Sequence, residues 1–437
     1  MSKPLKSLHK SKIFGTMGNA STSASYPTEL SGSYSKNRQL LYFTSIKYIL
    51  AFITLGLLTA CVPLERRSAP PFSTSNHASV QGLENIRYSL TTQSGIDAIV
   101  ADIDEQHRKV PFRNDTKEVN LLSISGGGDN GAFAAGLLNG WSERNDRPRF
   151  QLVTGVSTGA LIAPFAYLGS DYDHVLNQVY TQVQQKDIFK PIGLLSALFR
   201  DSYADSSPLM KLISTHITAD VLRKIAHEYN VNHRWLIVGT TNLDAGMPIA
   251  WNMGKIASQG TPEALELFKK ILLASASIPG AFPPVLFDVE INHQKYQEMH
   301  VDGGASTQAF LYPPTLHRNT NNDPQFSKLK WRAYIIRNAR LDLKRMEIER
   351  RTTSIASRTI EQLIYAQGLG DLYRMYIITQ ADGVEFNLAF IDSTFNFPHT
   401  REFDTKYMKA LFEYAKDKAS KGYPWWSAPP GIERTLH

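Results

Sequence analysis

The stretch from residue 153 to residue 161 constrains the fold more than any other part of this sequence. It reads Val-Thr-Gly-Val-Ser-Thr-Gly-Ala-Leu, with a helix-forming run after the serine. This is the pattern of a nucleophile elbow, a sharp strand-to-helix turn that exposes the serine hydroxyl. Neighbouring chain passes close to such a turn, so Gly155 and Gly159 need to lack side chains. The pattern predicts Ser157 as a nucleophile, and a glycine-rich turn without catalytic function is the alternative.

Segments on either side of the elbow alternate between strand-like and helix-like patterns. A buried strand is predicted over 119–125, further strands over 150–156, 235–241, 331–336 and 385–391, and the end of a strand over 299–302. Helices are predicted over 96–107, 132–141, 160–168, 209–229, 262–276, 349–379 and 405–421. Strands that alternate with helices predict an α/β protein with a mainly parallel central sheet covered on both faces. With 437 residues, of which 42% are apolar, the chain can bury a large core.

Positive charge is concentrated at the N-terminus. The formal net charge is +7, and residues 1–60 supply +6 of it, because they hold seven Lys or Arg and one acid, Glu29. The rest of the chain is nearly neutral and has no basic patch interleaved with aromatic residues. This distribution argues against a nucleic-acid partner.

The single cysteine, Cys61, excludes an intrachain disulfide. It follows Leu58-Thr59-Ala60 and an uncharged apolar run, residues 48–57, which is flanked by Lys47. Such a run is of signal-peptide length and too short to span a bilayer comfortably. The segment resembles a bacterial lipoprotein signal, which implies cleavage before Cys61, acylation of Cys61 and lipid anchoring in the bacterial cell envelope, at the outer membrane. An uncleaved membrane anchor is the alternative.

A glycine-rich loop separates the strand predicted over 119–125 from its helix. Gly126, Gly128 and Gly131 match the dinucleotide fingerprint, but that fingerprint also needs an acid at the end of the next strand, and residues 154–157 carry none. The other use of this geometry is an oxyanion hole, in which the amides of Gly126, Gly127 and Gly128 converge at a helix N-terminus. We expect Gly127→Ala to lower turnover and to leave the fold nearly intact.

Asp302 is the predicted general base. It ends a strand and precedes the tight turn that Gly303 and Gly304 allow, and an ordinary Asp-Gly turn is the alternative. No histidine lies in a recognisable turn motif after the elbow. His300 shares a strand face with Asp302, where we expect it to orient or pack and not to catalyse. An aspartate has a pKa of about 3.9 and stays ionised in mildly acidic solution unless burial raises that value.

Four motifs in this order resemble the patatin-like phospholipase family. They are the glycine-rich loop at 125–132, the Gly-x-Ser-x-Gly elbow at 155–159, an Ala-Ser…Pro…Phe-Pro segment at 274–284 and the Asp-Gly-Gly turn at 302–304. The resemblance implies a three-layer α/β sandwich that hydrolyses the carboxylic esters of membrane lipids, as a phospholipase A or lysophospholipase. It implies a dyad of Ser157 and Asp302 with no histidine, metal or cofactor, and the glycine amides as oxyanion hole.

The resemblance also divides the chain. Residues 1–60 are the expected signal peptide, residues 61–115 a tether and N-terminal extension, and residues 116–318 the patatin-like catalytic domain. Residues 319–437 form a C-terminal α/β portion packed on the core, beginning at the polar loop 319–326. No protein partner is readable.

One position departs from the family pattern. The family has Arg or Lys before the last glycine of the loop, where this chain has Asn130, preceded by Asp129. A cation at this position favours a phosphate-bearing substrate. Its absence argues against a preference for phospholipids, but it does not argue against ester hydrolysis. A non-catalytic lipid-binding lipoprotein and a dinucleotide-binding enzyme remain alternatives. The apolar run 189–199 is either a lid or acyl-chain wall, or buried core.

Overall fold

The structure is a computed structural model that describes residues 47–48, 65–71, 78–109, 118–191, 202, 204–313, 329–342 and 346–432. The chain divides into two compact units, Met1–Val62 and Pro63–His437. Cys61, residues 49–57 of the apolar run before it, the polar loop 319–326 and residues 192–199 lie outside the described residues. In the part of the chain that is described, no helix combines the length and the apolar character needed to cross a membrane.

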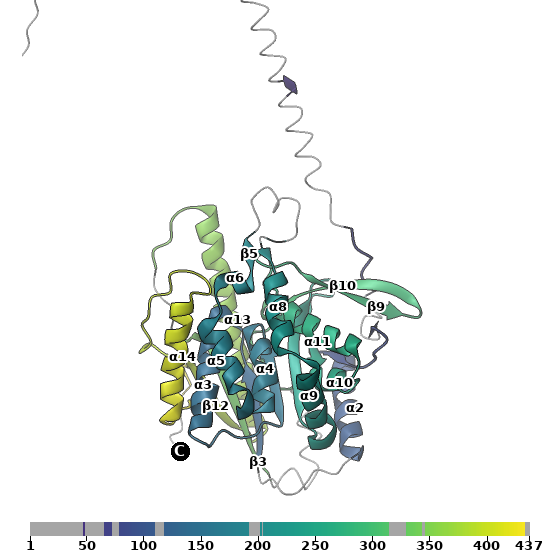
Figure 1. Cartoon of the computed structure of the whole chain (residues 1–437), viewed down its shortest axis with the longest axis horizontal. Helices are drawn as coiled ribbons and strands as arrows, with labels where there is room; N and C mark the ends of the chain where they lie inside the picture. Colours follow the sequence, from purple (N-terminus) through teal and green to yellow (C-terminus); the bar gives the residue numbers. More distant parts are fainter. Residues whose placement is uncertain are drawn as a thin grey trace, which may run out of the picture. The chain divides into compact units, whose positions relative to one another are not determined.

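One large sheet organises the second unit (Figure 1). Its main strand order is β1 (Ser79–Val80), β9 (Val285–Ile291), β10 (Gln294–Asp302), β7 (Trp235–Asn242), β4 (Leu152–Val156), β3 (Glu118–Ile124), β11 (Lys330–Arg340) and β12 (Glu385–Ile391). The strands from β7 to β12 in this order are parallel. Antiparallel pairs extend the β7 side through β10, and through β8 (Met247–Asn252) and β2 (Arg87–Ser89). The predicted α/β fold with a mostly parallel central sheet is confirmed.

Helices cover both faces of this sheet, which makes three layers. The larger core contains side chains of α3 (Gly131–Glu143), α4 (Thr158–Leu168), α5 (Asp173–Gln182), α8 (Ser207–His216), α9 (Ala219–Asn232), α10 (Met253–Ala257), α11 (Pro262–Ser275) and α14 (Thr405–Ser420). On the other face lie α13 (Thr352–Ala381) and α2 (Gln93–Lys109). Because side chains alternate along a strand, Leu122 and Ile124 of β3 enter the larger core, whereas Val119 and Leu121 face α13.

The five parallel strands end on one side of the sheet, called the carboxyl edge below. β3 ends at Ile124 and β4 at Val156, immediately before the glycine-rich loop and the elbow. The antiparallel strand β10 brings its last residue to the same place, because Asp302 pairs with Thr240 near the end of β7. The sheet topology therefore collects the three predicted site segments at this edge.

Two parts of the predicted secondary structure differ from the observed fold. The helix expected over 209–229 is two helices, because Thr218 interrupts it and caps α9 by accepting a hydrogen bond from the Val221 amide at 3.4 Å. The hairpin partners β8 and β9 were not predicted. Both pair with strands beside the site, so that the antiparallel side of the sheet is larger than expected.

The C-terminal portion does more than pack on the core. It contributes β11 and β12 to the same sheet, and α14 lies against α3 at very short range. A Cβ atom at Gly136 would lie 2.1 Å from the Phe412 carbonyl oxygen, and one at Gly140 would lie 2.1 Å from the Lys416 carbonyl oxygen. Glycine at these two positions lets the helix backbones touch.

We predict that Gly136→Ala destabilises the protein. The added methyl has to push α14 away from α3, which costs roughly 1–3 kcal/mol. Gly370→Ala is the matched control, because its nearest neighbour would be the Arg374 side chain at 4.0 Å, and replacing an unconstrained helical glycine gains roughly 0.5–1 kcal/mol. Urea unfolding of the two variants checks this, and equal midpoints would contradict the close packing of α3 on α14.

Candidate active site

Ser157 occupies a strained turn between β4 and α4. Its φ is 55° and its ψ is −125°, a region that non-glycine residues rarely adopt. A Cβ atom at Gly155 would lie 2.4 Å from the Gly159 carbonyl oxygen, and one at Gly159 would lie 2.2 Å from the Ile124 carbonyl oxygen. The chain therefore has the tight geometry of a nucleophile elbow. Both positions need glycine because neighbouring backbone lies too close for a side chain.

A second serine holds the elbow in place. The Ser157 amide donates a hydrogen bond to the Ser275 hydroxyl at 3.0 Å, and that hydroxyl donates to the Gly239 carbonyl at 2.6 Å. Ser275 is the last residue of α11 and is fully buried. It belongs to the Ala-Ser…Pro segment, which thus links the elbow to β7.

Asp302 lies next to Ser157 across the end of β7. One carboxylate oxygen, Oδ1, accepts a hydrogen bond from the Gly304 amide at 2.7 Å. The other, Oδ2, is buried and has no partner at normal hydrogen-bond distance among the described residues. The Ser157 hydroxyl lies near enough to favour the ionised carboxylate, although it is not at normal hydrogen-bond distance. An unsatisfied carboxylate oxygen beside a serine hydroxyl is a ready proton acceptor.

Burial controls the ionisation of Asp302. Removal from water raises the pKa of its carboxyl to about 7, against the opposing effects of the Ser157 hydroxyl and the Gly304 amide. The exception allowed for from the sequence, that burial raises this pKa, therefore applies to Asp302. Its neutral and charged forms are both populated near neutral pH.

The glycine-rich loop lies directly beside Ser157, but its three amides are not equivalent. A Cβ atom at Gly126 would lie 3.2 Å from the Ser157 Cβ. The Gly126 amide already donates to the Gln308 carbonyl at 3.1 Å, so it is not available to an oxyanion. No such bond engages the amides of Gly127 and Gly128 within the described chain. The candidate donors are therefore two amides instead of the predicted three.

Asn338, in β11, locks this loop. Its amide donates to the Ser125 hydroxyl and its Nδ2 donates to the Ser125 carbonyl, both at 2.9 Å, while its Oδ1 accepts from the Ala134 amide at 3.1 Å. Gly127, with φ at 155°, crosses Asn338 so closely that a Cβ atom would lie 2.2 Å from the Asn338 carbonyl oxygen. A strand of the C-terminal portion thus shapes the candidate oxyanion hole.

Comparison with known proteins identifies the segment that carries this geometry. Residues 122–313 match the sequence profile of the patatin-like phospholipase family. They form a patatin-like phospholipase domain. This assignment confirms the predicted family and indicates lipid ester hydrolysis in general terms.

Two other comparisons add little. The solved structure of VipD from Legionella pneumophila aligns with a TM-score of 0.34 and 11% identity, over 70% of this chain and 67% of that chain. No curated protein matches the sequence. The patatin-like assignment therefore rests on residues 122–313.

The patatin-like loop of this chain has Asn130 where the family has a base, and Asp129 precedes it. Asp129 is buried, and its carboxylate accepts hydrogen bonds from the Phe403 amide at 2.9 Å and from His399 Nε2 at 2.7 Å. Asn130 Oδ1 accepts from the Tyr407 hydroxyl at 2.6 Å. Both side chains are therefore used to fasten the loop to the segment before α14 and to that helix, and neither offers positive charge to a substrate.

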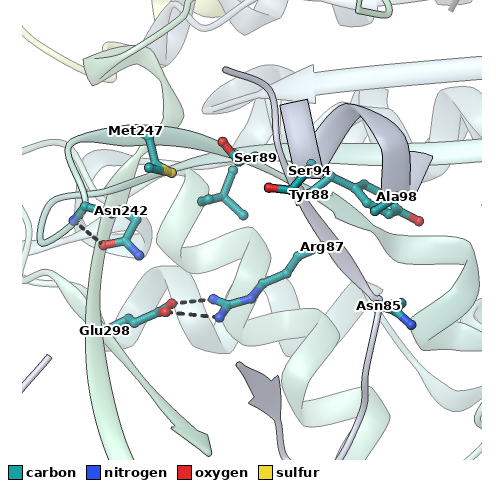
Figure 2. A pocket seen from close by; sticks show the side chains of 12 residues that line it. Asn85, Arg87, Tyr88, Ser89, Ser94, Ala98, Asn242, Met247 and Glu298 are labelled. Carbon is teal, nitrogen blue, oxygen red and sulfur yellow. Dashed lines mark hydrogen bonds and ion pairs between the residues drawn. The ribbon is translucent and has the colours of Figure 1, made fainter. Parts of the chain in front are cut away.

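His300 does not face the candidate dyad. It is fully buried, with Nδ1 at 2.9 Å from the Thr240 hydroxyl and Nε2 at 3.2 Å from Glu298. Figure 2 shows Glu298 paired with Arg87, at 3.0 Å between Oε1 and Nη2, beside a cavity of about 110 Å³. Burial raises the pKa of Glu298, but the opposing effects of Arg87 and His300 together are stronger and the pKa falls to about 2. This network connects β10 to Thr240 of β7 and to Arg87 of β2.

Several residues of the site carry no sequence motif. Gln308 bridges the two halves, because its carbonyl holds Gly126 while its Nε2 donates to the Gly304 carbonyl at 2.9 Å. Its own amide donates to Asp371 of α13 at 2.7 Å. Like Asn338, these residues act through long-range contacts that no local pattern reveals. Among the described residues, no three His, Cys, Asp or Glu side chains gather as they would around a metal ion.

We predict that Gly127→Ala disturbs folding as well as turnover, which corrects the expectation from sequence. The methyl would meet the Asn338 backbone at 2.2 Å, whereas one at Gly128 would meet open space at a φ of 57°. Gly127→Ala should therefore lose roughly 1–3 kcal/mol or more of stability, and Gly128→Ala about 1 kcal/mol of backbone strain. Thermal melting of both variants tests this, and a Gly127→Ala protein as stable as Gly128→Ala would contradict the described loop.

Proposed function

We propose that this protein is a lipid acyl hydrolase that cleaves carboxylic esters through a dyad of Ser157 and Asp302. The observation that supports it most is the free, buried Asp302 Oδ2 beside the strained Ser157. Asp302 takes the proton of the Ser157 hydroxyl as the serine oxygen attacks the ester carbonyl carbon. The amides of Gly127 and Gly128 stabilise the negative charge that develops on the carbonyl oxygen.

The rest of the cycle uses the same groups. The tetrahedral intermediate expels the alcohol, which receives the proton from Asp302, and the acyl group stays on Ser157. Water then attacks the acyl-enzyme and Asp302 accepts a proton from that water. The fatty acid leaves as Asp302 returns this proton to the Ser157 oxygen, which regenerates the serine hydroxyl and the carboxylate. No step needs a metal or an organic cofactor.

The substrate is proposed to be a membrane lipid ester, cleaved as by a phospholipase A or a lysophospholipase. With Asp129 and Asn130 in the loop, recognition depends on the acyl chain and the ester more than on a phosphate. We further propose that the mature chain begins at a lipidated Cys61 and is held in the bacterial envelope, at the outer membrane. A non-catalytic lipid-binding lipoprotein is the competing function.

A fluorophosphonate probe tests the dyad. We predict that Asp302→Asn blocks labelling of Ser157 as completely as Ser157→Ala, because the nucleophile loses its proton acceptor. His300→Ala and His399→Ala should still be labelled. The asparagine variant should fold, since it removes a buried charge and keeps an oxygen for the Gly304 amide.

The outcomes separate the competing functions. Labelling of Ser157 together with release of fatty acid from a bacterial lipid extract, both lost in Asp302→Asn, supports the proposal. Absence of labelling and of products in the folded wild-type protein favours a lipid-binding protein. If a histidine variant lost labelling while Asp302→Asn kept it, the site would be a triad and the dyad would be wrong.

A further inference from the structure

Exposed large apolar side chains gather at the carboxyl edge of the sheet. The second unit has ten of them among the described residues, and eight lie in segments at or beyond this edge. Four belong to the N-terminal half of α13: Ile355, Ile360, Leu363 and Ile364. Single exposed apolar residues are ordinary, but a cluster of this kind marks an interaction surface.

The N-terminal half of α13 projects beyond the sheet. The helix has 30 residues and spans about 45 Å, whereas the following strand β12 has seven residues and spans about 23 Å. Figure 1 shows this half of the helix, in light green, rising past the other helices. Ile360, Leu363 and Ile364, at helical i, i+3 and i+4 spacing, share one face and are 57%, 65% and 46% exposed.

Two further exposed apolar residues lie next to the candidate site. Ile278 follows Ser277, whose carbonyl accepts the Asp302 amide at 2.8 Å. Phe397 lies two residues before His399, the partner of the glycine-rich loop. Exposed apolar residues therefore also occur in segments that contact Asp302 and the glycine-rich loop.

Positive charge borders this surface. A groove of about 690 Å³ lies between α6 (Gln185–Ile188) and residues 400–406, at the same edge. It is lined by Lys186, Arg401 and Lys406 and by one acid, Asp404. Within the described chain, none of the three cations is in an ion pair. Cations outside ion pairs, at the same edge as exposed apolar side chains, fit a surface that meets anionic lipid head groups.

The tether begins at this edge too. Arg66 pairs with Asp244, directly after β7, at 2.9 Å, and Ser68 accepts a hydrogen bond from the Gln297 amide of β10 at 3.1 Å. Four residues lie between Cys61 and Arg66, and the five steps of fully extended chain that join them span at most about 18 Å. A lipid on Cys61 would thus be held near the carboxyl edge.

We propose that the carboxyl edge is the membrane-docking face, and that it lies against the bilayer in which Cys61 is anchored. The apolar face of the N-terminal half of α13 enters the head-group region, and Lys186, Arg401 and Lys406 meet anionic phosphates. This inference deepens the proposed function and rests on it for the substrate, because docking would hold Ser157 over the lipid esters. α13 lies in the interface and does not span it.

A matched pair of positions on one helix tests the orientation. Leu363 and Ile377 are both 65% exposed on α13, and their separation of 14 residues puts them about 21 Å apart along the axis. We introduce Leu363→Cys or Ile377→Cys into the full chain, in a Ser157→Ala background that removes hydrolysis. The membrane-extracted proteins are labelled with the fluorophore NBD and reconstituted into vesicles of phosphatidylethanolamine and phosphatidylglycerol.

We expect NBD at position 363 to emit at shorter wavelength and to be quenched by spin labels on the lipid acyl chains, while NBD at position 377 emits as in water. Water-like emission at both positions, or equal quenching at both, would overturn the proposal. A blue shift at position 363 without lipid quenching would also overturn it, because protein and not lipid would then cover the helix.

The unsubstituted Ser157→Ala chain is the labelling control. Cys61 is its only cysteine, and a thioether-linked lipid would leave it unreactive. Labelling of Cys61 would count against the proposal, because the anchor argument would be lost. Since these proteins cannot hydrolyse esters, quenching tests docking alone, and failure of the Ser157–Asp302 dyad would be seen separately in the fluorophosphonate experiment.

Discussion

Burial of the Asp302 carboxylate is the constraint on which the rest of the site depends. The group ends β10, accepts one backbone amide and leaves its second oxygen without a partner. A buried, half-satisfied carboxylate is costly, and it persists because pairing with β7 and the hydrogen bond from its own amide to Ser277 fix its backbone. The cost is of the kind that functional sites retain, since the same burial brings the pKa near the pH at which a general base works best.

The site is assembled from both ends of the patatin-like domain and from the chain that follows it. Asn338 of β11 fixes the glycine-rich loop, and Asp371 of α13 holds the backbone of Gln308, which in turn connects Gly126 to Gly304. Residues 319–437 therefore support the site directly. The family profile ends at residue 313, whereas the sheet continues through β11 and β12.

The sequence predicted those features that depend on local backbone geometry. An elbow needs small residues at fixed spacing, and a serine at φ 55° between Gly155 and Gly159 follows from that need. The strands and helices of the parallel part were predicted for the same local reason. Two features of the site could not be predicted from the sequence. The Gly126 amide donates its hydrogen bond to Gln308, and the pKa of Asp302 depends on burial. Both effects arise only when segments that are distant in the sequence come together.

The pH dependence of the labelling rate of Ser157 by a fluorophosphonate is the most direct test that Asp302 is a buried general base. The account predicts a rate that rises with pH through a single midpoint near 7, because the carboxylate must lose its proton before it can accept one from serine, and burial raises its pKa to about 7. Replacing Asp302 by Asn should remove the titration together with the labelling. A rate that stays constant down to about pH 5, as for an aspartate of ordinary pKa near about 3.9, or a midpoint that survives in the Asn variant, would contradict the account.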